Sequence, residues 1–294
     1  MAIFTPTAYW ASTAAPSTGP FSPSDLNNVR SWVNFPDGYW NFGQGGSTLF
    51  SIQDQNGTQT LSWTISSTPN PQTTSLIKLN QTTNPTILNF VRADGEYIQS
   101  SNGTFANNSN HYVVQLINII GATQGNASIF TYEATTGGDY EVEEGGSGSN
   151  VRWNGRYRLN GPSSQQFENW FSANSTTRKY LNQFNVYAYI FNKTGSLISG
   201  RVNGNPLLNS LTYTGQMGSA GRILYAVNGL LNRKVGMQLA ESIVVSDIPG
   251  TGGTNIDNVE KLEGYLAWKY YNPSLTNNLV NLLPSNHPYK NQAP

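Results

Sequence analysis

The stretch that decides the fold of this chain is Val259-Glu-Lys-Leu-Glu-Gly-Tyr-Leu-Ala-Trp-Lys-Tyr-Tyr271, followed by Leu283-Pro-Ser-Asn-His-Pro-Tyr-Lys290. Its apolar residues recur at helical spacing, namely Val259, Leu262, Leu266 and Tyr270. This periodicity predicts an amphipathic helix with one stripe facing a core. We expect the helix to stop at Asn272-Pro273 and a Pro-rich tail to lie over the body of the protein.

Two local features refine this expected helix. Asp257 and Glu260 have the spacing of a capping box, and acidic residues are favourable at the positive end of the helix dipole. Gly264 lies in the helix interior, where glycine costs about 1 kcal/mol relative to alanine. We therefore expect Gly264 to be needed for close packing against a neighbouring backbone.

The C-terminal segment resembles the end of the concanavalin A-like, laminin-G-type β-sandwich domains. In those domains a strand with an acidic-aliphatic run leads into a helix of the type IEGYLAWKW and a tail of the type LPxxHPYK. The resemblance implies an all-β, concanavalin A-like jelly-roll β-sandwich with a C-terminal amphipathic helix. It also implies a strand over residues 237–246 just before the helix and a structural role for His287.

The rest of the chain shows short β-rich runs separated by turn clusters, which is typical of a sandwich rather than of βαβ units. We predict strands near residues 86–92, 112–120, 184–191 and 222–227. Asp94-Gly95 predicts a hairpin that joins 86–92 to 96–99, and Asn203-Gly204 predicts another turn. Residues 1–20 are an expected N-terminal arm with Phe4, Tyr9 and Trp10 as anchors, and the sandwich domain is expected over residues 21–294.

Composition excludes several classes of partner and chemistry. Sixteen basic and sixteen acidic residues balance, and only 11% of residues are charged, so we expect no nucleic acid or anionic membrane as a partner. There is no cysteine, which excludes disulfides and thiolate sites. No apolar run is long enough to span a bilayer, and the first residues lack the features of a signal peptide.

The residue patterns disfavour an enzyme. Glu141 and Glu143 resemble the paired acids of laminarinase-type glycoside hydrolases, but the third acid of that pattern is replaced by Gly146, and we expect a solvated acidic hairpin. Only two histidines exist, and nothing supports a catalytic triad. We expect no cofactor. Calcium is the alternative, disfavoured because the loop acids do not cluster: Asp37, Asp54, Asp94 and Asp139.

Aromatic residues beside Gly- and Asn-rich segments favour a binding function. A sugar ring stacks its apolar face on Trp or Tyr, while amide side chains read its hydroxyl groups. The segment Arg152-Trp-Asn-Gly-Arg-Tyr-Arg158 makes Trp153, Asn154 and Tyr157 the candidate glycan ligands. The alternative is that these aromatic residues fill the core or a protein interface.

The resemblance extends to domains in structural proteins of phages and large DNA viruses. It implies a non-enzymatic virion structural protein (a capsid decoration, minor capsid protein or tail adhesin) on the virion surface. Its expected partners are copies of itself and other virion proteins, with host or environmental glycans as ligands. The alternatives are a secreted or cell-surface carbohydrate-binding module and, less favoured, a glycoside hydrolase.

Overall fold

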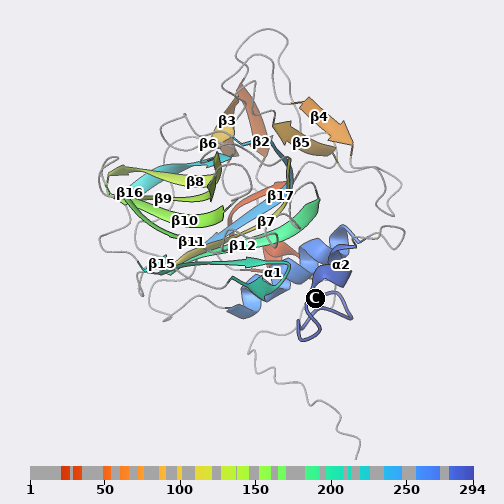
Figure 1. Ribbon diagram of the computed structural model, residues 1–294. Helices are drawn as coiled ribbons and strands as arrows, with labels where there is room; N and C mark the ends of the chain where they lie inside the picture. The colour runs from red at the N-terminus through yellow and green to blue at the C-terminus, as the bar shows by residue number, and fades with distance from the viewer. Residues whose placement is uncertain are drawn as a thin grey trace, which may run out of the picture.

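The computed structural model describes residues 21–26, 29–34, 49–53, 60–65, 72–75, 86–90, 98–100, 110–120, 127–136, 138–145, 152–159, 165–169, 183–192, 197–207, 211–212, 219–225, 235–246, 256–271 and 278–294. These residues form two antiparallel sheets that face each other, with a helix on the far side of one sheet (Figure 1). The structure confirms the predicted class, a concanavalin A-like β-sandwich closed by a C-terminal amphipathic helix. The predicted arm anchors Phe4, Tyr9 and Trp10 lie outside the described residues.

The sheet beside the helix, called sheet A, has the strand order β14-β13-β12-β7-β17-β5-β4, with β1 paired to β17 and β15 paired to β13. Its strands are β1 (Val29–Asn34), β4 (Gln72–Ser75), β5 (Thr86–Phe90), β7 (His111–Ile119), β12 (Phe184–Asn192), β13 (Leu197–Val202), β14 (Asn205–Pro206), β15 (Leu211–Thr212) and β17 (Met237–Ser246). The predicted strands at 112–120, 184–191 and 237–246 therefore correspond to its three central strands.

The opposite sheet, called sheet B, has the order β11-β10-β9-β8-β16-β6-β3-β2. Its strands are β2 (Leu49–Gln53), β3 (Thr60–Ile65), β6 (Ile98–Ser100), β8 (Ala127–Thr136), β9 (Gly138–Gly145), β10 (Arg152–Leu159), β11 (Gln165–Asn169) and β16 (Ser219–Tyr225). The other elements are η1 (Pro23–Asp25), α1 (Ile256–Lys269) and α2 (Leu279–Leu282). Within the described part of the chain, neither helix is long and apolar enough to span a membrane.

The space between the sheets is filled by alternate residues of the strands. The Phe130 ring of sheet B lies 6.3 Å from Tyr189 of sheet A and 5.6 Å from Tyr225. The Tyr225 hydroxyl also reaches across to sheet A, where it lies 2.8 Å from Ser242 Oγ in a buried hydrogen bond. Aromatic packing and this hydrogen bond together fix how the sheets face each other.

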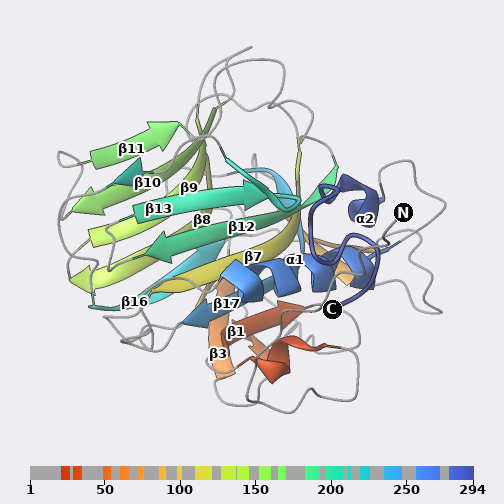
Figure 2. The same cartoon turned by 90° about the horizontal axis from the view of Figure 1, so that it is seen from below.

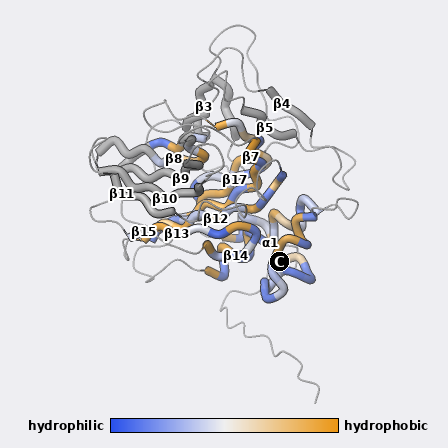
Figure 3. Tube along the Cα trace, in the orientation of Figure 1, coloured by the Kyte–Doolittle hydropathy of each residue, from blue (hydrophilic) through white to orange (hydrophobic). Residues whose placement is uncertain are grey.

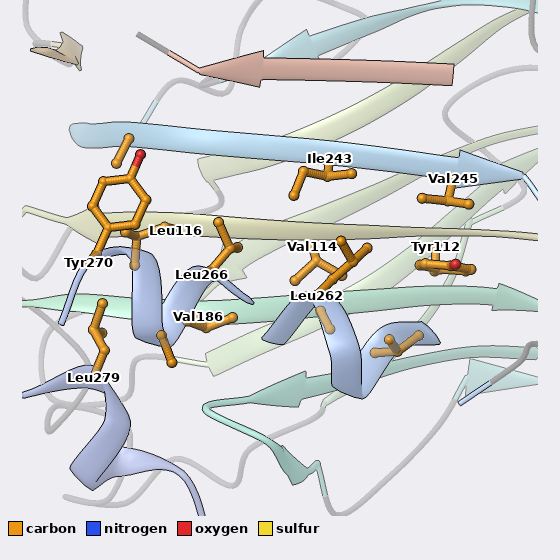
Figure 4. Packing of buried hydrophobic residues seen from close by; sticks show 14 of the residues in the cluster. Tyr112, Val114, Leu116, Val186, Ile243, Val245, Leu262, Leu266, Tyr270 and Leu279 are labelled. Carbon is orange, nitrogen blue, oxygen red and sulfur yellow. The ribbon is translucent and has the colours of Figure 1, made fainter. Parts of the chain in front are cut away.

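Helix α1 lies across the other face of sheet A, over β12, β7 and β17 (Figure 2). The stripe predicted from the sequence is buried there, with Leu262 and Leu266 directed toward Val114, Leu116 and Val186 (Figure 4). Because β7 packs against α1 on one face and against sheet B on the other, six of its nine residues are apolar and both faces are buried. The hydrophobic colouring accordingly concentrates on these strands and on α1 (Figure 3).

Three local predictions need correction. The Asp94-Gly95 hairpin is wrong, because β5 pairs within sheet A and β6 within sheet B, so the chain crosses between sheets there. The capping box is also wrong: α1 begins at Ile256, which places Asp257 inside the first turn. Close packing at Gly264 is confirmed, but the neighbour is the Tyr289 side chain rather than a backbone.

The predicted Asn203-Gly204 turn is confirmed. Both residues have positive φ, 50° and 77°, as a two-residue turn between β13 and β14 requires. Asn203 is also buried, where its Oδ1 accepts a hydrogen bond from the Val186 amide at 2.9 Å and its Nδ2 donates to Asn185 Oδ1 at 2.9 Å. The turn is thus tied to β12 as well as to its own hairpin.

Candidate functional site

The three predicted glycan ligands all belong to β10, near one edge of sheet B. They lie within a strand, whereas the sequence placed them beside loops. The pairing of β10 with β9 is regular from Arg152 to Leu159, so alternate positions share a face. The structure thus places all three residues in the same strand, and their side chains lie outside what it describes.

The pairing of β10, β9 and β8 also shows which face of sheet B points toward sheet A. Gly155 is directly opposite Val142 on β9, and Val142 is directly opposite Phe130 on β8. Val142 is fully buried, and the Phe130 ring faces sheet A. This pairing places β10 beside β9 in sheet B. The assignment of Trp153, Asn154 and Tyr157 to a ligand stays a prediction.

The acidic segment is confirmed as part of a hairpin, formed by β8 and β9. Glu141 and Glu143 both belong to β9. In the backbone register of β9 and β10, Glu141 is opposite Arg156 and Glu143 is opposite Asn154.

Sequence reasoning missed a buried ionic cluster that joins β13 to α1. Arg201 donates from Nε to Glu263 Oε1 at 2.9 Å and from Nη2 to Glu263 Oε2 at 3.1 Å. Its Nη2 also reaches Glu260 Oε1 at 3.2 Å and the Gly204 carbonyl at 2.8 Å. Burial alone lowers the pKa of Arg201, but the hydrogen bonds and charges of Glu263 and Glu260 outweigh it and raise that pKa overall.

His287 completes this cluster from the C-terminal segment. Its ring is buried, with Nε2 at 3.3 Å from Glu263 Oε2. Its Nδ1 accepts a hydrogen bond from the Tyr289 amide at 3.2 Å. Because Nδ1 is an acceptor, the neutral ring carries its proton on Nε2 and donates to Glu263. The structural role implied for His287 by the resemblance is thus supported by its contacts.

A second buried carboxylate fastens the other side of α1. Glu241 Oε1 accepts from Trp32 Nε1 at 2.7 Å, and Oε2 accepts from Lys269 Nζ at 2.8 Å and from Tyr270 Oη at 2.9 Å. The Lys269 ammonium lies between 5.2 and 6.0 Å from the ring centres of Trp32, Tyr265 and Tyr270. The pKa of Tyr270 is raised well above its ordinary value, mainly because the side chain is buried and secondarily because of the negative charge of Glu241.

A metal site would need several clustered oxygen or nitrogen ligands. The part of the chain that the structure describes contains no group of three or more His, Asp or Glu residues suited to a metal. Three of the acids considered for calcium, Asp37, Asp54 and Asp94, lie outside the described residues, and Asp139 is on β9 opposite Arg158.

No protein-family model matches the chain, and no curated protein matches it. Solved structures do resemble it. Domain 4 of AbnA, a GH43 extracellular arabinanase from Geobacillus stearothermophilus, in complex with arabinotriose, has a TM-score of 0.50 and 11% identity over 74% of this chain and 92% of that domain. The binding domain of botulinum neurotoxin DC in complex with SialylT has a TM-score of 0.52 and 11% identity over 83% of this chain.

The chain spans 52% of that neurotoxin domain. At 11% identity both likenesses concern the fold. The structure and these two comparisons therefore agree on a β-sandwich architecture.

Proposed function

We propose that this chain is a non-enzymatic virion structural protein with a lectin-like fold that binds host or environmental glycans. It serves as a capsid decoration, minor capsid protein or tail adhesin at the virion surface. Its partners are copies of itself and other virion proteins. The alternative is a secreted or cell-surface carbohydrate-binding module, which the 92% coverage of the arabinanase domain favours.

The non-enzymatic part of this proposal is supported by the structural role of the buried ionisable groups. Glu263 and Glu241 are both fully buried, and their carboxylates accept hydrogen bonds from neighbouring side chains. Arg201, Lys269 and His287 in turn direct their charged or polar groups at these carboxylates. These groups fasten α1 and the C-terminal segment to sheet A, and a rigid scaffold of this kind suits binding.

The glycan part rests on fold analogy and on residue chemistry. The two similar domains were solved with arabinotriose and with SialylT. Fold alone does not determine function, so the sugar ligand comes to this chain as a proposal. Tryptophan and tyrosine supply the stacking surface that a sugar ring needs, and Trp153 and Tyr157 both belong to β10.

The virion part rests on the resemblance and on the sequence. Low charge with zero net charge favours contacts through apolar and amide side chains. Residues 1–20, with Phe4, Tyr9 and Trp10, form a candidate assembly arm.

The experiment is to measure the mass of the full chain by light scattering and then to screen the same sample on a glycan array. A stable oligomer that binds a defined glycan is the expected result. A monomer that binds a glycan would favour the carbohydrate-binding module. Release of cleaved sugar would contradict the non-enzymatic assignment.

A further inference from the structure

The segment of residues 283–290, which we call the C-terminal strap, lies against α1. Tyr289 occupies the space beside Gly264, where an added Cβ would lie 2.6 Å from the Tyr289 Cβ. The Tyr289 carbonyl accepts a hydrogen bond from Trp268 Nε1 of α1 at 2.8 Å. The strap is thus fitted to one side of α1 by close packing and by a side-chain hydrogen bond.

His287 is the buried centre of the strap. Its side chain has no exposed surface, and its ring packs over the turn between β13 and β14, where a Cβ added to Gly204 would lie 2.6 Å from the ring Cδ2. Its Nδ1 accepts a hydrogen bond from the Tyr289 amide at 3.2 Å, and its Nε2 lies 3.3 Å from Glu263 Oε2. One ring nitrogen therefore shapes the strap, and the other fastens the strap to α1.

This arrangement accommodates one proton on the ring of His287. Its Nδ1 faces the N–H group of Tyr289, which is a donor, so Nδ1 must present its lone pair. The single ring proton is then on Nε2, from where it donates to Glu263. A second proton would set an Nδ1–H group against the Tyr289 N–H group, and the hydrogen bond that shapes the strap would be lost.

The carboxylates beside the ring are already paired with a cation. Glu263 Oε1 accepts from Arg201 Nε at 2.9 Å, and Glu263 Oε2 accepts from Arg201 Nη2 at 3.1 Å. The oxygen that faces His287 is therefore shared with a guanidinium group. Glu260, the other acid of this cluster, lies 3.2 Å from Arg201 Nη2 through its Oε1. A protonated ring would place a second positive charge next to Arg201.

Two further charged groups lie close to the strap. Burial raises the pKa of the Tyr289 hydroxyl, and the negative charges of Asp257 and Glu260 raise it further. Lys290 Nζ donates to backbone carbonyls at the end of α2, at 2.8 to 2.9 Å. These two groups act on Tyr289 and on α2, while the hydrogen bonds of the His287 ring go to Glu263 and Tyr289.

We propose that His287 is an acid-sensitive lock, in which uptake of a second proton by the ring releases the C-terminal strap from α1. The docked ring holds one proton, whereas the ring of a histidine in water holds two below about pH 6.5. Because the released form binds more protons, its population relative to the docked form should rise about tenfold per pH unit below that value. Release uncovers the side of α1 that carries Gly264 and Trp268. This inference is independent of the glycan and virion roles proposed above.

The Tyr289 amide reports directly on the lock, because it is the donor to His287 Nδ1. Its hydrogen exchange is followed by NMR on the isotope-labelled full chain between about pH 7.5 and 5.5. The intrinsic exchange rate at each pH divided by the measured rate gives a protection factor, which removes the pH dependence of the exchange chemistry. The Asn203 amide, which donates to the Val186 carbonyl at 2.7 Å, is the internal reference in the sandwich.

The expected result is a fall of about tenfold in the protection factor of Tyr289 from pH 6.5 to 5.5, with no change for Asn203. His287→Asn should abolish the fall, because the asparagine oxygen still accepts from the amide two residues on but takes up no proton in this range. His111 is the other histidine of the chain, and the matched control His111→Asn should leave the fall unchanged.

Three outcomes would overturn the inference. The first is a protection factor of Tyr289 that does not change with pH in the wild-type chain. The second is a fall of equal size in the His287→Asn chain, and the third is a fall shared by Asn203, since another group or unfolding of the sandwich would then be responsible. The nitrogen chemical shifts of His287 give a measurement that needs no variant: at about pH 7.5 they should place the proton on Nε2, and a proton on Nδ1 would contradict the lock.

Discussion

Substitution of Gly264 by alanine tests how the C-terminal segment holds α1. A Cβ at this position would lie 2.6 Å from Tyr289 Cβ, 2.8 Å from its Cγ and 3.0 Å from its Cδ2. In an isolated helix the substitution stabilises by about 1 kcal/mol. Here the Tyr289 backbone must move, and overpacking of this kind costs about 1–3 kcal/mol. We expect a net loss of up to about 2 kcal/mol.

The assay is urea unfolding followed by circular dichroism and tryptophan fluorescence, with coincident transitions required before a free energy of unfolding is extracted. The control repeats the substitution in a Tyr289→Gly chain, which lacks the Cβ that clashes. There the sign should reverse, and Gly264→Ala should stabilise by about 0.5–1 kcal/mol. Stabilisation of the wild-type chain, or an equal loss in both backgrounds, would refute the packing at this site.

Three further predictions concern the contacts that hold the sandwich and α1 together. Arg201→Ala should lower the free energy of unfolding by about 3–5 kcal/mol, because Glu263 is left as an uncompensated buried charge; a loss under about 1 kcal/mol in urea would contradict this. Tyr270 has a raised pKa from burial and from Glu241, so above about pH 10 the folded chain binds more protons than the unfolded chain. The contribution of Tyr270 to the free energy of unfolding is complete below about pH 10 and falls by about 1.4 kcal/mol per pH unit as the pH rises further. Tyr270→Phe should therefore flatten the plot of the free energy of unfolding against pH between about pH 9 and 11. Parallel plots for the wild-type and Tyr270→Phe chains would contradict this prediction. Tyr225→Phe should cost about 1 kcal/mol through loss of the bond to Ser242, and an unchanged urea midpoint would show that the bond does not form in solution.

The elements governed by local periodicity could be predicted from the sequence. The stripe from Val259 to Tyr270 predicts α1 and the face it buries, since helix geometry alone relates those positions. The apolar run in β7 predicts a strand covered on both faces. Asn203-Gly204 predicts its turn, because few residue pairs tolerate positive φ at both positions.

The contacts between distant segments could not be predicted in this way. Arg201, Glu263 and His287 meet only because β13, α1 and the C-terminal segment pack together, and their spacing in the sequence carries no periodic signal. One signal was available: Glu263 lies beside the apolar stripe of α1, and a carboxylate near a buried stripe needs a cation. The Asp94-Gly95 prediction failed because turn chemistry does not reveal whether the chain stays in one sheet.

The most direct test of the central claim is a glycan-array comparison of the wild-type chain with Trp153→Ala, Tyr157→Ala and Thr212→Ala. Circular dichroism establishes beforehand that each variant is folded, and Thr212, exposed on β15, is the control position. The account predicts that the wild-type chain retains a defined glycan in uncleaved form. It predicts that both aromatic variants lose this glycan and that the control keeps it. A folded wild-type chain that binds no glycan, or that cleaves the glycan it binds, would contradict the account.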